Sequence, residues 1–178
     1  MNMEMNMNEL TNRAFLLTTY AVYPEPGNNL PYAVLGLADE LFGEYYSEYI
    51  DDDQERMKEE LLDVFWYVNQ VSFELSCLLG SAFERHLDNN NVPYTSLEQA
   101  AQAVGVLAGI AKKIIRDGKQ SAFKKHDKAL ESLVVIKNFI HTELDELSIP
   151  LDEAIELLHE KLGDRQERNV LHGDGDHR

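Results

Sequence analysis

The spacing of apolar residues between positions 54 and 79 most constrains the fold of this chain. In this stretch aliphatic and aromatic side chains recur every three or four positions, which places them on one face of an α-helix. The clearest part of the pattern is formed by Leu61, Val64, Phe65, Val68 and Val71. No strand pattern competes with this helical periodicity along the chain. The sequence therefore predicts an all-α protein, built as a helical bundle.

Further helices are expected on both sides of this central one. Pro and Gly residues within 24–31 enforce an extended loop, and the polar stretch 87–95 is typical of a linker. Ser96 and Gln99 have the form of a capping box, which marks the start of a helix. The expected helices cover residues 9–20, 32–50, 54–79, 96–118, 123–147 and 150–163.

Length and composition indicate one domain over 1–178. The chain has 178 residues, 44% of them hydrophobic, which suits a single globular domain. No apolar run approaches a membrane span, and residues 1–10 lack the basic and apolar segments of a signal peptide. Cys77 is the single cysteine, so an internal disulfide is excluded, which fits the cytoplasm. The net charge of −16 argues against a nucleic-acid polymer as a partner.

Two pairs of acidic residues are candidates for chemistry. Glu60 and Asp63 lie three positions apart on the central helix, so their side chains meet on one face. Glu40 and Glu44 lie four apart and share a face of the helix before it. Two helices that each present two carboxylates can form an oxygen cage for Mg²⁺ or Mn²⁺. A solvated acidic edge is the alternative reading of either pair.

The surrounding residues make the sequence resemble a known family, the all-α nucleoside triphosphate pyrophosphohydrolases of the MazG type. That family carries the motif E-x-x-E followed, after a loop, by E-x-x-D. The matching pieces are Gly36-Leu37-Ala38, Gly43-Glu44, and Glu59-Glu60-Leu61-Leu62-Asp63-Val64 with Trp66-Tyr67. Segments 18–38 and 161–178 resemble phage-type members, so the resemblance reaches both halves of the chain.

The resemblance implies hydrolysis of a (deoxy)nucleoside triphosphate to the monophosphate and pyrophosphate, with Mg²⁺ or Mn²⁺ as cofactor. It makes Glu40, Glu44, Glu60 and Asp63 the metal ligands, and Glu40 or Glu44 the general base through a water. The substrate-binding residues that we expect are Lys161, Arg165, Lys112, Arg116 and Tyr67. It also implies a homo-oligomer, most simply a dimer, in the cytoplasm, which is the host cytoplasm if the chain is phage-encoded.

The sequence departs from the family pattern at three points. The first two acids are four apart instead of three, which a plain helix tolerates or a π-bulge absorbs. Leu158 stands where the family has an asparagine, and the basic segment 109–119 follows both acidic motifs instead of lying between them. These departures favour an alternative function, a catalytically degenerate helical protein with a regulatory or protein-interaction role.

The chain also carries a hint of an internal repeat. A shift of 70 residues lays 33–68 on 103–138 and matches Ala33-Val34, Leu37-Ala38, Lys58 and Val64 with identical residues. The four acids then fall on aliphatics, namely Ile110, Ile114, Leu130 and Leu133. Two readings stay open: a coincidence of helical periodicity, or a metal-bearing half (9–86), a degenerate half (96–163) and a tail (164–178).

Overall fold

The structure is a computed structural model that describes residues 13–20, 25–79 and 93–168. Every regular element in these ranges is a helix, so the all-α prediction is confirmed for them. The elements are η1 (Leu17–Tyr20), α2 (Leu30–Asp39), η2 (Glu40–Tyr45), α3 (Tyr46–Asp51), α4 (Gln54–Leu79), α5 (Leu97–Asp117), α6 (Gln120–Phe123), α7 (His126–Glu146) and α8 (Leu151–Glu167). None of the described helices is both long and apolar enough to cross a membrane.

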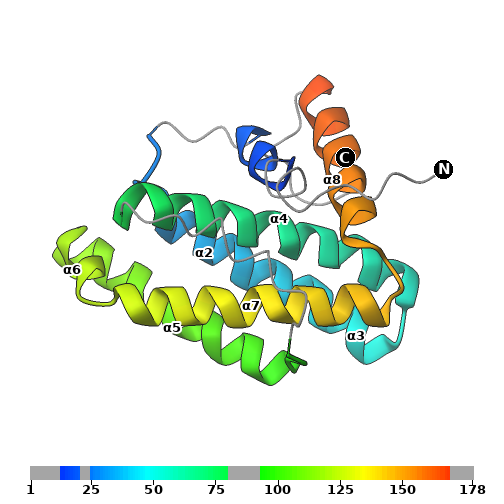
Figure 1. The fold of residues 1–178 in the computed structure, drawn as a ribbon, viewed down its shortest axis with the longest axis horizontal. Helices are drawn as coiled ribbons and strands as arrows, with labels where there is room; N and C mark the ends of the chain where they lie inside the picture. Colours follow the sequence, from blue (N-terminus) through cyan, green and yellow to red (C-terminus); the bar gives the residue numbers. More distant parts are fainter. Residues whose placement is uncertain (1–12, 21–24, 80–92, 169–178) are drawn as a thin grey trace.

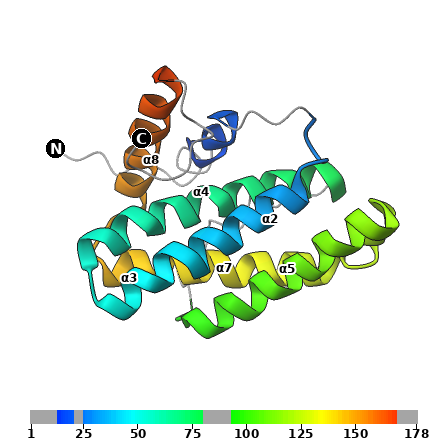
Figure 2. The same ribbon diagram turned by 180° about the vertical axis from the view of Figure 1, so that it is seen from behind.

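Four helices form the body of the protein. Helix α2 packs against α4, α5 packs against α7, and the two pairs join through contacts of α2 with α5 and of α4 with α7 (Figures 1 and 2). Helix α8 and the short η1 lie outside this ring, against α4 and against each other. The acidic residues of α4 therefore have α2 and η2 on one side and α8 on another.

The centre of the bundle is filled by the apolar stripes that the periodicity predicts. The fully buried side chains include Leu37, Leu61, Val68, Leu107, Leu133 and Phe139, drawn from all four helices. Each such side chain contributes about 1.5–3 kcal/mol when it leaves water. Trp66 is also buried, at 5% exposure.

The ends of the helices follow local chemistry. The capping box at α5 is confirmed, because Ser96 accepts from the backbone N–H of Gln99 and the Gln99 side chain accepts from that of Ser96. At the N-terminus of α2 the cap comes from a distant residue. The buried Glu74 of α4 accepts from the backbone N–H of Asn29 at 2.8 Å and from its side-chain amide at 3.1 Å. This pairing fixes the start of α2 against the end of α4.

The expected helix over 32–50 is interrupted by a π-helix. Residues Glu40–Tyr45 form η2, whose wider turn lies between two ordinary α-helical stretches. Of the two ways to accommodate the four-residue spacing of Glu40 and Glu44, the structure has the π-bulge. In a π-helix the i and i+4 side chains remain close to one face, because one turn contains more than four residues.

Two helix boundaries differ from the expectation. The helix expected to end near Gly163 continues to Glu167, so Lys161 and Arg165 lie on one face of α8, one turn apart. A glycine inside a helix costs only about 1 kcal/mol, which the packing of α8 outweighs. The helix expected over 123–147 is α7, which begins at His126 after the separate short helix α6.

The four aliphatics of the repeat hypothesis lie on α5 and α7, the pair that packs as α2 and α4 do. Ile110 and Leu133 are buried, and Ile114 and Leu130 are partly buried against the same core. A degenerate second half would require all four in a dry core, and Ile114 and Leu130 are only partly buried. The repeat itself, and the division of the domain into halves, remain predictions.

Candidate active site

Three carboxylates from two elements meet beside α4. One ligand oxygen from each of Glu40, Glu60 and Asp63 lies within 4.8 Å of the other two. Glu40 comes from the start of η2, and Glu60 and Asp63 come from consecutive turns of α4, against which η2 packs. Oxygens around one Mg²⁺ ion at about 2.1 Å are at most about 4.2 Å apart, so a small inward movement completes a shared site.

Glu44 lies at the rim of this triad. It is exposed, but its charge acts on both Glu60 and Glu40. The four acids thus form one cluster, which we call the acid cluster: Glu40, Glu44, Glu60 and Asp63. Three of them converge on a common point, and the fourth faces solvent next to it.

Three buried oxygens of the acid cluster lack hydrogen-bond donors. Oε2 of Glu40, Oε2 of Glu60 and Oδ1 of Asp63 are buried and have no hydrogen-bond partner among the described residues. Burial, together with the charges of Asp63 and its neighbours, raises the pKa of Glu40 from 4.5 to about 8. Burial and the nearby carboxylates of Glu44 and Asp63 also raise the pKa of Glu60. A cluster of this kind is electrostatically incomplete without a cation.

Two cations from α8 reach the acid cluster from the opposite side. Nζ of Lys161 donates to Oδ2 of Asp63 at 2.9 Å, and a guanidinium nitrogen of Arg165 lies 3.5 Å from the same oxygen. Leu158, one turn earlier, is fully buried and anchors α8 where the resembled family has an asparagine. These two predicted substrate-binding residues therefore lie beside the acids.

Tyr67, the third predicted substrate-binding residue, lies flat against α2. A Cβ atom added to Gly36 would approach the Tyr67 ring at 2.1 Å, so only glycine allows this contact. The centroid of the ring is 4.9 Å from that of Trp66. Tyr67 and Gly36 line an open hollow of about 740 Å³ with Leu35, Asp39, Phe42 and Gly43. Two of these lining residues, Asp39 and Gly43, directly precede Glu40 and Glu44 in the sequence.

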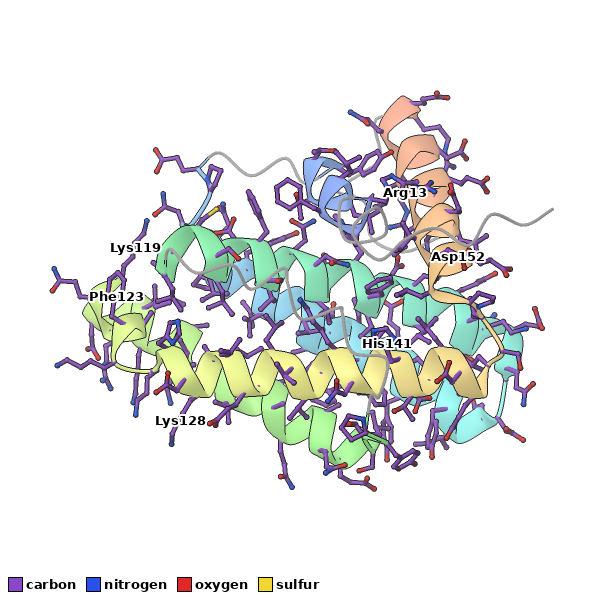
Figure 3. All side chains as sticks on the ribbon, viewed as in Figure 1. Arg13, Lys119, Phe123, Lys128, His141 and Asp152 are labelled. Atoms are coloured by element: carbon purple, nitrogen blue, oxygen red, sulfur yellow. The ribbon has the colours of Figure 1, made fainter. Side chains whose placement is uncertain are left out.

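The other predicted substrate-binding residues lie elsewhere. Lys112 and Arg116 are on the last turns of α5, which packs against α7, α2 and α6. That end of the bundle carries α6, whereas the acid cluster adjoins α3 at the other end (Figure 1). Figure 3 marks the α6 end with Lys119, Phe123 and Lys128, far from α8. The structure therefore does not bring Lys112 and Arg116 to the acids. The histidines of the C-terminal tail, His172 and His177, lie outside the described residues.

One feature next to the acid cluster was not predicted from the sequence. The hydroxyl of Tyr45, the last residue of η2, donates to Oε2 of Glu143 on α7, and both side chains are buried. The Tyr45 ring also packs edge-on against Phe139 at 6.0 Å between centroids. A signal was present, because Glu143 occupies a core position of α7 one turn after Phe139 and Ile140. A lone acid in an apolar register indicates a buried partner.

None of the known protein families, curated proteins or solved structures with which the sequence was compared matches it. The resemblance to the MazG type therefore stays a prediction, and the argument for function depends on the acid cluster and its surroundings.

Proposed function

We propose that this protein hydrolyses a nucleoside or deoxynucleoside triphosphate to the monophosphate and pyrophosphate in the presence of Mg²⁺. The observation that carries the proposal is the convergence of Glu40, Glu60 and Asp63 beside the cations Lys161 and Arg165. Carboxylates that converge next to Lys and Arg suit a metal-bound polyphosphate, which presents both positive and negative charge.

The residues fit a hard divalent cation. The three buried oxygens without hydrogen-bond donors belong to the converging carboxylates, and oxygen ligands are those that Mg²⁺ and Mn²⁺ prefer. Glu40, Glu60 and Asp63 would hold the ion, with Glu44 as a fourth ligand. When bound, the ion neutralises the triphosphate and polarises the attacked phosphorus and the water.

The remaining chemistry belongs to side chains around this centre. Lys161 and Arg165 are placed to exchange part of their contact with Asp63 for contacts with phosphate oxygens, Lys as a point charge and Arg as a planar fork. Glu44, at the exposed rim, is placed to take a proton from an attacking water. Glu40 is the second candidate for this role, although its burial favours the protonated form.

The hollow at Tyr67 suits the rest of the substrate. It combines an aromatic ring with the apolar Leu35 and Phe42, and two of its lining residues directly precede Glu40 and Glu44 in the sequence. A nucleobase stacks on such surfaces with little dependence on its identity. We therefore place the phosphates at the acid cluster and the base toward Tyr67.

The direct test is product analysis with a panel of NTPs and dNTPs. We expect equal amounts of monophosphate and pyrophosphate with Mg²⁺, and no reaction with EDTA. Glu60→Gln should abolish turnover, whereas the matched control Glu59→Gln should not, because Glu59 is exposed and lies outside the acid cluster. Release of inorganic phosphate instead of pyrophosphate, or equal loss in both variants, would contradict the proposal.

One observation favours the non-enzymatic alternative. Asp63 already has two cations within 3.5 Å, so α8 could serve as a permanent counter-charge in a helical interaction protein. Two cations do not neutralise four carboxylates, however, and burial together with the charges of Asp63, Glu44 and Glu60 raises the pKa of Glu40. We therefore favour the enzyme. Absence of turnover together with an unfolded Lys161→Gln variant would reverse this choice.

We further propose a homodimer that works in the cytoplasm, where nucleoside triphosphates are found. Large apolar side chains are exposed along α2, η2 and α3, namely Tyr32, Leu35, Phe42, Tyr46, Tyr49 and Ile50. Single exposed apolar residues are common on protein surfaces, but several on consecutive elements suit contact with a partner subunit. Sedimentation equilibrium of the whole chain would show whether the dimer forms.

A further inference from the structure

The positive charge of this acidic protein is concentrated in one short stretch. Residues 112–128 contain seven of the 16 Lys and Arg residues but only two acids, Asp117 and Asp127, a net charge of +5. The rest of the chain therefore carries a net charge of −21. This basic stretch forms the end of α5, the whole of α6 and the beginning of α7.

The basic stretch encloses a hollow. The hollow has a volume of about 370 Å³ and is lined by Lys113, Arg116, Gln120, Ser121, Lys124 and Lys125, with Asp117. Lys113 and Lys125 also line an adjacent hollow of about 180 Å³, together with Lys112 and Lys128. The larger volume is within the range of small-ligand sites, about 300–1,000 Å³.

Helix electrostatics explain only part of this charge. Lys112, Lys113 and Arg116 lie in the last turns of α5, where cations complement the negative helix end. Lys124, Lys125 and Lys128 lie at the N-terminus of α7, the positive end of a helix. Cations there are unfavourable. Residues that oppose a local rule in this way are expected at functional positions.

The lysines of the hollow form no ion pair with an acid among the described residues. Arg116 is held by Asp117 through two bonds, at 2.7 Å and 2.6 Å. Asp127 contacts the ring of His126 at 3.1 Å. Within the described ranges no ion pair joins Lys113, Lys124 or Lys125 to an acid. Their charge is therefore available to an external anion.

We propose that this hollow, between the end of α5, α6 and the start of α7, binds a compact polyphosphate anion. A compact anion lies wholly among the lysines, and charges more than about 8 Å away are screened at physiological salt. An extended nucleic acid would run past the basic stretch toward the rest of the chain, which carries a net charge of −21. The hollow is thus a second anion site, at the opposite end of the bundle from the acid cluster.

The test measures binding of inorganic pyrophosphate by calorimetry in buffer with EDTA. Turnover and metal play no part, so the result is independent of the proposed hydrolysis. Lys113→Gln with Lys125→Gln should weaken binding about tenfold, because the variant removes two of the cations that line the hollow. The control Arg56→Gln with Lys58→Gln removes two surface charges elsewhere and should leave binding unchanged.

A second variant keeps the test decisive if the lysine variant folds poorly. Asp117→Asn removes the acid that holds Arg116 and should tighten pyrophosphate binding. Unchanged or weaker binding in this variant contradicts the proposal. So does the absence of saturable binding to the unaltered chain, or binding that the double lysine variant retains in full.

Further titrations identify the source of the anion. The affinities for inorganic phosphate, pyrophosphate and a nucleoside triphosphate distinguish a bare phosphate group from a nucleotide effector. Tighter binding of pyrophosphate or of the nucleoside triphosphate than of inorganic phosphate supports the proposal. A single-stranded oligonucleotide is the competing ligand. If it binds more tightly than pyrophosphate and loses affinity in the double lysine variant, the site belongs to a polymer and the proposal is wrong.

Discussion

The Tyr45 hydroxyl donates to the Glu143 carboxylate, and this bond joins the π-helix that carries Glu40 and Glu44 to α7 on the far side of the core. Burial raises the pKa of Glu143, and burial and the bond to Glu143 raise that of Tyr45. The two groups are therefore interdependent, because each would be an unsatisfied buried polar group without the other. The bond holds the end of η2 one residue from Glu44.

We expect Tyr45→Phe to destabilise the protein by about 1–3 kcal/mol, because it leaves the Glu143 carboxyl buried without a donor. Chemical denaturation measures this effect. Tyr49→Phe is the matched control, since Tyr49 is 47% exposed and its loss should have little effect. Adding Glu143→Leu to Tyr45→Phe should recover part of the lost stability. A double variant that is less stable than Tyr45→Phe would show that the apolar replacement does not fit.

The close contact between Gly36 and Tyr67 gives a steric prediction. Gly36→Ala should cost about 1–3 kcal/mol, because the added Cβ would lie 2.1 Å from the ring and must displace it. Gly105→Ala is the control, since nothing lies within 4 Å of its added Cβ, and it should stabilise α5 by about 0.5–1 kcal/mol. Thermal unfolding of both variants tests whether the first lowers and the second raises the stability of the protein. Equal effects would mean that Tyr67 moves away freely.

Metal-free stability should depend on pH through Glu40. Its pKa is raised by burial and by neighbouring acids from 4.5 to about 8, so the folded protein binds this proton more tightly than the unfolded chain. The contribution is favourable below pH 4.5 and is lost as the pH rises toward 8. Denaturation in EDTA should therefore show a free energy of unfolding that decreases between pH 4.5 and about 8. Saturating Mg²⁺ should make this decrease smaller. A Glu40→Gln variant that keeps the full dependence would contradict the assignment.

The sequence predicted the fold and the acid cluster through short-range rules. The stripe around Leu61 and Val68 could only be helical, and the spacing of Glu60 and Asp63 fixes a shared face whatever else the chain does. The position of α8 was not predictable, because Lys161 and Asp63 are 98 residues apart and no local pattern joins them. The sequence resemblance nevertheless indicated Lys161 and Arg165 as substrate-binding residues.

Other features depend on tertiary packing, which cannot be predicted from the periodicity of apolar residues. The choice between a plain helix and a π-bulge at Glu40–Tyr45 depends on how Leu41 and Tyr45 fill the core, and the sequence left both open. The resemblance predicts Lys112 and Arg116 at the substrate. The type of a residue does not determine at which end of the bundle it lies. The packing of α5 puts Lys112 and Arg116 at the α6 end.

The last prediction separates a functional acid from a structural one. Glu60→Gln should abolish turnover yet leave metal-free stability unchanged or raised, because it removes one charge from a cluster of mutually repelling acids. Mg²⁺ should then stabilise the variant less than the unaltered chain. Denaturation with and without Mg²⁺ measures both effects, with Glu59→Gln as the control. If Glu60→Gln unfolds in EDTA while Glu59→Gln does not, Glu60 is a structural partner of a basic residue such as Lys161, and its role as a metal ligand is wrong.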